Sequence, residues 1–223
     1  MGSKGSGRRL ADTIIYAAWN GVGVSTSRVD VPHGARVICA DAGVEACLAL
    51  GLVPDIIVGD MDSVSTDVLV RAEALGAKVV RFPAHKDETD LELALLEAAR
   101  LEARVVDIHG AVGGRIDHTM ANMDLGFRFT RLGLDIRVCG DWGEALFLSG
   151  QVRCVELVGN PGDTVSLMPW TERASGVCTW GLEYPLNEED LRRGYTRGVS
   201  NRMIGEAAGV SVRVGDLLVI HLA

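Results

Sequence analysis

Apolar and polar positions along the first two thirds of the chain alternate between two patterns. Short apolar runs are separated by longer segments in which apolar residues recur every three or four positions. The clearest longer segment is 89–102, which follows the i, i+3, i+4, i+7 spacing of an amphipathic helix at Leu91, Ala94, Leu95 and Ala98. This alternation is typical of repeated βα units and predicts a parallel sheet.

The alternation predicts six strands and four helices. We expect strands near 13–18, 36–40, 55–58, 78–82, 104–108 and 135–139, and helices near 44–50, 66–75, 89–102 and 116–132. After residue 141 the pattern changes to short β-rich runs separated by Gly, Pro and Asn, at 152–158, 164–168, 210–214 and 217–222. Such runs predict an antiparallel β domain.

The sequence therefore indicates an α/β fold with two domains. We expect a disordered leader or cloning remnant at 1–12, because this stretch is rich in Gly and Ser and is charged. A Rossmann-like domain with a parallel sheet is expected at 13–145, and a smaller all-β domain, sandwich-like or barrel-like, at 146–223. The boundary is expected near 143–150, although no Pro/Ser-rich linker marks it.

Composition and charge narrow the possible partners. The 223 residues are 48% hydrophobic, enough for a sizeable core, which excludes global disorder. A net charge of −8 argues against nucleic acid or an anionic membrane as a whole-surface partner. A small phosphorylated ligand remains compatible with this charge when acidic groups hold a metal ion.

Cysteines and targeting signals indicate the compartment. The five cysteines are odd in number and widely spaced, which predicts neither a disulfide framework nor a zinc site and favours a reducing cytoplasm. The N-terminus lacks the apolar centre of a secretory signal. No stretch approaches the roughly 18 apolar residues of a membrane span, so we expect a cytoplasmic protein without membrane association.

The first chemical motif follows the predicted strand at 55–58. Gly59 is followed by Asp60 and Asp62, two aspartates separated by one residue. The carboxyl end of a parallel strand is where such folds bind ligands, and residues two apart in extended chain point to the same side. The pair is therefore a candidate Mg²⁺ site, and a solvated acidic turn is the alternative.

The second motif opens the clearest predicted helix. Lys86, Thr89 and Asp90 lie where free backbone N–H groups and the helix dipole favour anions. Thr89 with Glu92 also forms a capping box, which needs no ligand. Capping leaves Lys86 unexplained, because a lysine among carboxylates suits a magnesium–phosphate complex.

Two further motifs occur at predicted strand ends. The run 109–118 has three glycines followed by Arg115 and Asp117, and glycines let backbone approach phosphate while an arginine fork grips its oxygens. His118 in this run is either a packed helix residue or a catalytic group. Asp41 caps the next helix or contacts the ligand directly. No G-x-x-x-x-G-K-[ST] motif occurs, so an ATP site of the P-loop type is excluded.

Taken in order and spacing, these motifs resemble thiamin pyrophosphokinases over about residues 36–222. The resemblance rests on Asp41-Ala-Gly, Gly59-Asp-Met-Asp-Ser63, Lys86-Asp-Glu-Thr-Asp90, Gly113-Gly-Arg-Ile-Asp-His118 and Gly198-Val-Ser-Asn201. It implies transfer of pyrophosphate from ATP to the thiamin hydroxyl, giving thiamin diphosphate and AMP. It also implies Mg²⁺ as cofactor, ATP and thiamin as the small-molecule partners, and a homodimer with thiamin bound near the subunit junction.

The resemblance also assigns roles to residues. It implies that the catalytic acids are Asp60, Asp62, Asp90 and Asp117, the first three of which hold the metal. It implies ATP or phosphate contacts at Asp41, Lys86, Thr89 and Arg115, and thiamin contacts at Tyr184, Ser200 and Asn201. Stacking of the cationic thiazolium on Tyr184 is favourable, and ordinary packing is the alternative role of that ring. Trp180 is a second aromatic residue available for stacking.

Three positions depart from the family pattern and leave one other function open, and a second alternative comes from the motif at residues 60–64. Ala42 and Glu45 stand in the family's Asp-Gly-Gly-Ala-Asn motif, and Arg202 stands where an acidic residue is common. A non-catalytic nucleotide- or thiamin-sensing module is one alternative, against which the retained acidic residues argue. The other is a haloacid dehalogenase-type phosphatase, since residues 60–64 match D-x-D-x-[TV]. That nucleophile normally follows the first strand, whereas Asp60 follows the third.

Overall fold

The computed structural model describes residues 9–17, 31–151 and 153–223, and these form two compact units. The α/β unit consists of Ala11–Phe129 and Ile136–Asp141, and the β unit contains Thr130–Asp135 and Trp142–Ala223. The two-part α/β fold expected from the sequence is confirmed. Residues 1–8 of the expected leader, and positions 18 and 152 of two expected strands, lie outside the described residues.

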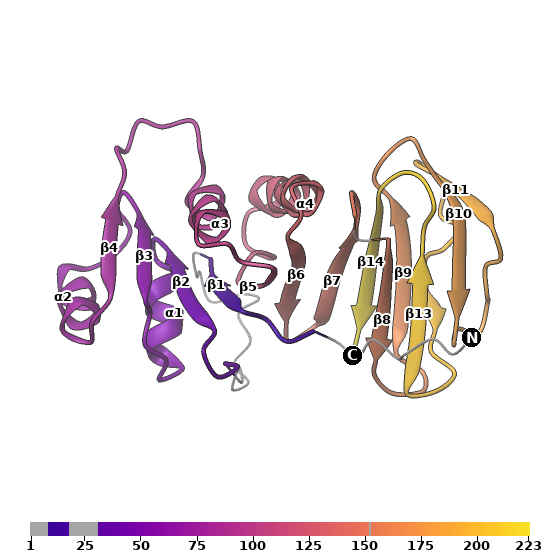
Figure 1. Ribbon diagram of the computed structural model, residues 1–223, viewed down its shortest axis with the longest axis horizontal. Helices are drawn as coiled ribbons and strands as arrows, with labels where there is room; N and C mark the ends of the chain where they lie inside the picture. The colour runs from indigo at the N-terminus through magenta and orange to yellow at the C-terminus, as the bar shows by residue number, and fades with distance from the viewer. Residues whose placement is uncertain (1–8, 18–30, 152) are drawn as a thin grey trace. The chain divides into compact units, whose positions relative to one another are not determined.

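The sheet of the α/β unit is built from the first six strands (Figure 1). These are β1 (Thr13–Tyr16), β2 (Arg36–Ala40), β3 (Ile56–Gly59), β4 (Lys78–Arg81), β5 (Val105–His109) and β6 (Asp135–Gly140), in the order β6-β5-β1-β2-β3-β4. The pairs β5–β1, β1–β2, β2–β3 and β3–β4 are parallel. Parallel pairing brings the carboxyl ends of these strands to one edge.

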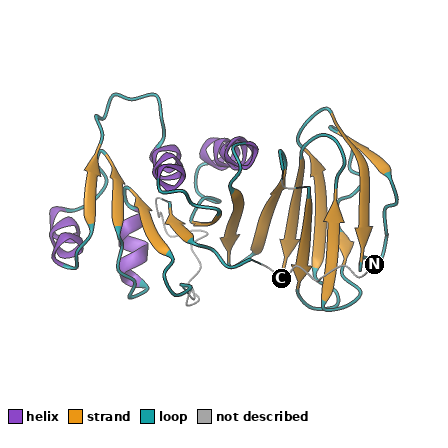
Figure 2. Cartoon of the chain, in the orientation of Figure 1, coloured by secondary structure: helices purple, strands orange, loops and turns teal. Residues whose placement is uncertain are grey.

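Helices cover both faces of this sheet, as Figure 2 shows. They are α1 (Gly43–Ala49), α2 (Thr66–Ala74), α3 (Asp90–Arg100) and α4 (Ile116–Arg131). α1 and α2 share a core with Ile14, Tyr16 and Cys39, while the alternate residues Ile15 and Ile38 are buried on the opposite face. Burial on both faces explains why these strands read as continuous apolar runs.

The β unit consists of two antiparallel four-stranded sheets. One has the order β12 (Asn201–Arg202), β9 (Thr164–Pro169), β14 (Leu217–Leu222), β7 (Gly143–Leu148). The other has the order β11 (Glu189–Arg192), β10 (Arg173–Trp180), β13 (Ala207–Ser211), β8 (Cys154–Val158). Inward side chains of both sheets form one apolar core, so the unit is a sandwich.

Several boundaries differ from those expected. Four strands were not predicted, because their sequences carry no clear apolar alternation: β7, β10, β11 and β12. Strand β13 begins three positions before the expected residue 210. The expected division between residues 145 and 146 falls inside β7, all six residues of which pair with β14. The last continuous segment of the β unit begins at Trp142. Among the described residues, no helix has the length and apolar character needed to cross a membrane.

Candidate functional site

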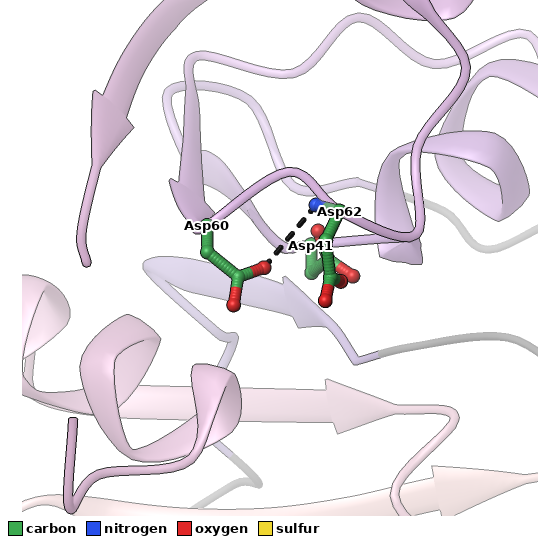
Figure 3. A group of neighbouring side chains, drawn as sticks. All are labelled: Asp41, Asp60 and Asp62. Carbon is green, nitrogen blue, oxygen red and sulfur yellow. Dashed lines mark hydrogen bonds between the residues drawn. The ribbon is translucent and has the colours of Figure 1, made fainter. Parts of the chain in front are cut away.

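Three aspartates gather at the carboxyl ends of β2 and β3 in the α/β unit. Asp41 directly follows β2, and Asp60 and Asp62 follow β3. One carboxylate oxygen from each lies within 4.8 Å of the other two. Figure 3 shows the three side chains gathered together. Carboxylates of the same sign repel one another unless a cation neutralises them, so this acidic cluster is suited to a divalent metal ion.

The backbone of the acidic cluster is held in unusual conformations. Asp41 and Met61 have φ values of 44° and 65°, in the left-handed region that residues other than glycine rarely adopt. The turn is closed where Asp60 Oδ1 accepts a hydrogen bond of 3.2 Å from the backbone N–H of Asp62. Ser63 Oγ donates to Asp62 Oδ1 at 2.9 Å. Local strain of this kind concentrates at functional sites.

Glycine is required at position 59 by the close approach of two carboxylate side chains. Its φ is 148°, and an added Cβ would lie 3.1 Å from both Asp41 Cβ and Asp90 Oδ1. The neighbouring strand end and the start of α3 therefore approach the backbone of β3 without a side chain between them.

The environment of Asp41 differs from that of Asp60. Asp41 is 3% exposed, and burial raises the pKa of its carboxyl, with Asp90 and Asp60 adding to the rise and Ser63 and the Ala42 N–H opposing it. Its Oδ1 has no hydrogen-bond partner within the described part of the chain. The pKa of Asp60 is lowered, chiefly by the Asp62 N–H and then by Lys86.

Lys86 joins two of the candidate acids. Its Nζ lies 2.9 Å from Asp90 Oδ1 and 3.6 Å from Asp60 Oδ2, and its side chain is largely buried. Burial is the largest single effect and works against the charge of Lys86, but its hydrogen bonds and charge interactions with Asp90 and Asp60 together outweigh burial and raise the pKa of the ammonium group. A fixed positive charge therefore lies beside the acidic cluster, where a polyphosphate would meet it.

The start of α3 is capped as the sequence predicts. Thr89 Oγ1 accepts a 3.3 Å hydrogen bond from the Glu92 N–H, and Asp90 is the first helical residue. Capping therefore explains the hydroxyl of Thr89, whereas the ion pair with Lys86 accounts for Asp90.

A glycine-rich loop follows β5. Gly110, Gly113 and Gly114 all have positive φ, which other residues adopt only with strain. Arg115 at the end of the loop pairs with Asp117 through Nε–Oδ1 (3.1 Å) and Nη2–Oδ2 (2.5 Å) contacts. This hydrogen bonding lowers the pKa of Asp117 to about 2. Both side chains are exposed, so Arg115 can exchange Asp117 for a phosphate group.

A cavity of about 270 Å³ lies among these segments of the α/β unit. Its lining includes Thr89, Asp90, Arg115 and His118, so three predicted phosphate or acidic positions and one undecided residue share one space. The remaining walls are Ala17, Ala40, Leu91, Gly110, Ala111, Gly113 and Asn122. Small residues and backbone leave this room for a ligand.

The structure regroups the predicted metal ligands. Sequence reasoning placed Asp90 with Asp60 and Asp62, and Asp41 with the phosphate contacts. In the structure Asp41 joins Asp60 and Asp62, and Asp90 pairs with Lys86. Asp117, predicted for the same acidic group, pairs with Arg115 instead.

Sequence reasoning also missed Thr119 and Asn122, which hydrogen-bond the glycine-rich loop. The three-residue spacing of Thr119 and Asn122 places them on one face of a helix, and this could have indicated that they act together.

The predicted thiamin residues lie in the β unit. Tyr184 is 64% exposed, and its backbone N–H and C=O are both bonded by the Asn201 side chain, at 3.0 and 2.7 Å. Asn201 Oδ1 also accepts from the Arg202 N–H. Ser200 has a φ of 61°, and its N–H donates to Ser166 Oγ. Asn201 therefore holds the segment that carries the Tyr184 ring.

Models of known protein families match both units of the protein. Residues 32–138 match the family model "Thiamin pyrophosphokinase, catalytic domain", and residues 154–219 match "Thiamin pyrophosphokinase, vitamin B1 binding domain". The two matches together cover more than half of the chain.

Individual thiamin pyrophosphokinases are similar to most of the chain. Thiamine pyrophosphokinase from Bacillus subtilis is 28% identical over 184 residues, which are 82% of this chain and 86% of the relative. A crystal structure of thiamine pyrophosphokinase from Bacillus subtilis superimposes with a TM-score of 0.80 at 25% identity, covering 95% of this chain and 98% of that one. A thiamin pyrophosphokinase family protein from Enterococcus faecalis gives the same TM-score, identity and coverage.

Proposed function

We propose the following reaction and site from the premise that the chain belongs to the thiamin pyrophosphokinase family. The protein is an ATP-dependent pyrophosphotransferase that converts thiamin and ATP to thiamin diphosphate and AMP. The observation that carries the proposal is the acidic cluster with Lys86 beside it, at the carboxyl edge of a parallel sheet. The family membership favours this reaction over a sensing module and over a haloacid dehalogenase-type phosphatase.

The residues of the acidic cluster fit Mg²⁺. Three carboxylates converge within 4.8 Å, and Asp41 Oδ1 is buried without a hydrogen-bond partner in the described part of the chain. Oxygen ligands of this kind are those that Mg²⁺ prefers. We assign Asp41, Asp60 and Asp62 as its holders, with Asp90 at the adjoining position. When bound, the ion would neutralise phosphate charge and orient the polyphosphate.

Groups of the α/β unit bind and orient ATP. Lys86 presents a fixed ammonium group, Arg115 presents an exchangeable guanidinium, and Thr89 lies with both Asp90 and Arg115 on the cavity wall. The glycine-rich loop allows a close backbone approach to phosphate. Positioning and charge neutralisation supply most of the catalysis in transfers of this type.

In the reaction, the oxygen of the thiamin primary hydroxyl forms a bond to the β-phosphorus of ATP. The bond from the β-phosphorus to the oxygen bridging it to the α-phosphorus breaks, and AMP leaves with that oxygen. The hydroxyl proton passes to a carboxylate, for which Asp60 and Asp90 are the candidates. Profiles of kcat against pH for Asp60→Asn and Asp90→Asn identify the acceptor, because loss of the acceptor removes the acidic limb.

The β unit supplies the thiamin contacts in this proposal. Tyr184 and Trp180 are exposed aromatic residues, and Asn201 anchors the Tyr184 segment. A cationic thiazolium is attracted to an aromatic face. We assign Tyr184, Ser200 and Asn201 to the thiamin side of the site.

We also propose that the working enzyme is a homodimer and has no nucleic acid partner. All five cysteines are free thiols, which supports a cytoplasmic location.

The test follows both products at once. The purified chain is incubated with ATP, Mg²⁺ and thiamin, and AMP and thiamin diphosphate are quantified, with each component omitted in turn. We expect the two products in equal amounts, and neither product after omission of thiamin or after chelation of the metal by EDTA. Binding of ATP or thiamin without AMP formation would overturn the proposal in favour of a sensor. Phosphate release without nucleotide would favour a phosphatase.

A further inference from the structure

Two side chains of α4 hold the glycine-rich loop, here defined as residues 110–115. The Thr119 hydroxyl accepts a 3.2 Å hydrogen bond from the Gly113 N–H and donates a 3.2 Å hydrogen bond to the Arg115 C=O. One turn later, Asn122 Nδ2 donates to the Ala111 C=O at 2.8 Å. Three backbone groups of a six-residue loop are therefore bonded by one face of one helix.

These bonds are placed to control the shape of the cavity. Asn122 is buried at 8% exposure, and it lines the cavity together with Ala111, Gly113 and Arg115. The glycines at 110, 113 and 114 have positive φ and lack side chains that would restrict them. Such a loop has much conformational freedom to lose when it orders around a ligand. Bonds from a rigid helix remove that freedom before the ligand arrives.

We propose that Thr119 and Asn122 are positioning residues that preorganise the glycine-rich loop for the triphosphate of ATP. The inference rests on the proposed function, because it takes ATP as the occupant of the cavity. Neither side chain touches the reacting atoms in this account. Thr119 holds the Gly113 N–H and the Arg115 C=O in place. Because the Arg115 side chain starts from that backbone, Thr119 also limits where its guanidinium group can lie. Asn122 fixes the start of the loop at Ala111.

An alternative is that the two residues only stabilise the start of α4. Both accounts predict a small loss of stability on mutation, so stability alone does not separate them. They differ in the effect on ligand affinity, because a loop that must order on binding lowers affinity even when the protein stays folded.

The test compares variants of matched shape. Thr119→Val replaces the half-buried hydroxyl by a methyl group, while Thr119→Ser keeps the hydroxyl. Asn122→Leu keeps the approximate volume and removes the donor. Met120→Leu, at an exposed position on the same helix, is the control. Affinity is measured by calorimetry with Mg²⁺ and α,β-methylene ATP, in which the bond that breaks in the reaction is replaced. KM for ATP and for thiamin, kcat and the thermal midpoint are measured in parallel.

We expect Thr119→Val and Asn122→Leu each to weaken the analogue about 5-fold to 10-fold, the effect of losing one or two hydrogen bonds. KM for ATP should rise by a similar factor, while KM for thiamin stays within twofold. Thr119→Ser should restore affinity, and Met120→Leu should match the parent protein. Analogue affinity within twofold of the parent in Thr119→Val would overturn the proposal, whatever its effect on the thermal midpoint.

The outcomes separate this inference from the proposed reaction. Absence of AMP formation by the parent protein would overturn the proposed function, and the analogue titration would still decide whether α4 preorganises the loop. Should Asn122→Leu not fold, the Thr119→Val and Thr119→Ser pair decides, because a methyl group is tolerated at a partly exposed position. Failure of the parent itself to bind the analogue would overturn the inference.

Discussion

At the scale of single residues, the acidic cluster combines strain with repulsion. Asp41 and Met61 have left-handed backbone conformations, each of which costs on the order of 1–3 kcal/mol for a residue with a side chain. The Asp41 N–H is nevertheless bonded to the Val58 C=O at 2.8 Å, so the sheet imposes this geometry. The fold therefore holds three like charges together at a stability cost that a bound cation would offset.

Asp62→Asn tests this balance. We expect kcat to fall by about 10²-fold or more, because a carboxylate of the proposed Mg²⁺ site is lost. The thermal midpoint should stay level or rise, since one of three repelling charges is removed. Steady-state kinetics and thermal unfolding measure the two effects, with Asp67→Asn on the exposed start of α2 as the control. More than a tenth of parental kcat in Asp62→Asn would contradict the role assigned to this residue.

At the scale of the elements, the site depends on how closely α1 packs on β1. Gly43 is the first residue of α1 and is buried against the backbone of Tyr16 and Ala17. A Cβ at this position would lie 2.0 Å from the Tyr16 C=O oxygen and 2.8 Å from that of Ala17. Glycine at this position thus sets the spacing of helix and strand and, with it, the place of Asp41 two residues earlier.

Gly43→Ala should destabilise the protein by about 1–3 kcal/mol or more, because backbone atoms cannot move aside as a flexible side chain would. Urea unfolding followed by circular dichroism measures the change. Gly205→Ala is the matched control, since an added Cβ at position 205 meets nothing within 4 Å and its φ is not in the left-handed region. Equal stabilities of the two variants would show that α1 can shift freely on the sheet.

A second element-scale feature is a buried histidine in the β unit. His221 on β14 is 3% exposed and lies between two carboxylates. Its Nδ1 is 3.7 Å from Glu144 Oε1 on β7, and its Nε2 is 3.3 Å from Asp163 Oδ2 in the loop before β9. Glu144 is the main cause of a raised His221 pKa, burial opposes the rise and Asp163 adds to it. The imidazolium thus links two strands and a loop.

Because the folded pKa of His221 exceeds its ordinary value of 6.5, its stabilising contribution is complete below about pH 6.5 and is lost as pH rises through the folded pKa. Asp163, whose pKa is lowered, stays ionised throughout this range. We expect the thermal midpoint of the parent to fall between pH 6 and pH 8.5 more steeply than that of His221→Gln. Parallel curves for the two proteins would contradict the assignment of this pH dependence to His221.

At the scale of the whole molecule, the candidate ligand sites are divided between two units. Predicted metal and ATP groups lie in the α/β unit, and predicted thiamin groups lie in the β unit. The β unit also exposes large apolar side chains in the segments next to Tyr184, since Trp180 is 52% exposed and Ile204, whose N–H donates to the Gly181 C=O, is 66% exposed. Apolar side chains that form a contiguous exposed patch mark interaction sites, whereas single exposed ones are ordinary. The proposed homodimer would cover them and form the thiamin site at the subunit junction.

Mixing two inactive variants tests a shared site. Asp62→Ala removes an acidic ligand and Tyr184→Ala removes a thiamin contact, so each alone should be strongly impaired. Subunit exchange in a dimer with shared sites restores about a quarter of the parental sites, by random pairing about a two-fold axis. Sedimentation should give about twice the chain mass of 23.8 kDa. Recovery absent from mixtures that contain mixed dimers would contradict the shared site, and a monomer would contradict the dimer.

Much of the architecture was predictable because its determinants are local. Four helices and the six strands of the sheet in the α/β unit occur where apolar periodicity placed them, within a few residues at each end. Four strands of the β unit escaped prediction because their pairing is long-range. The two-residue β12, for example, is a strand only because Asn201 and Arg202 pair with β9, more than thirty residues earlier in the chain.

The sequence by itself determined the α/β class, the β-rich second part, the motifs that identify the family and the capping of α3 by Thr89. Each of these depends on residue type and spacing within a short window. Only the tertiary structure decided that Asp41 joins Asp60 and Asp62, that Lys86 lies between Asp60 and Asp90, and that Thr119 and Asn122 hold the glycine-rich loop. Asp41 meets Asp60 and Asp62 because parallel pairing of β2 with β3 aligns strand ends that lie apart in the sequence, whereas the other two groups depend on how a loop folds back onto the helix that follows it.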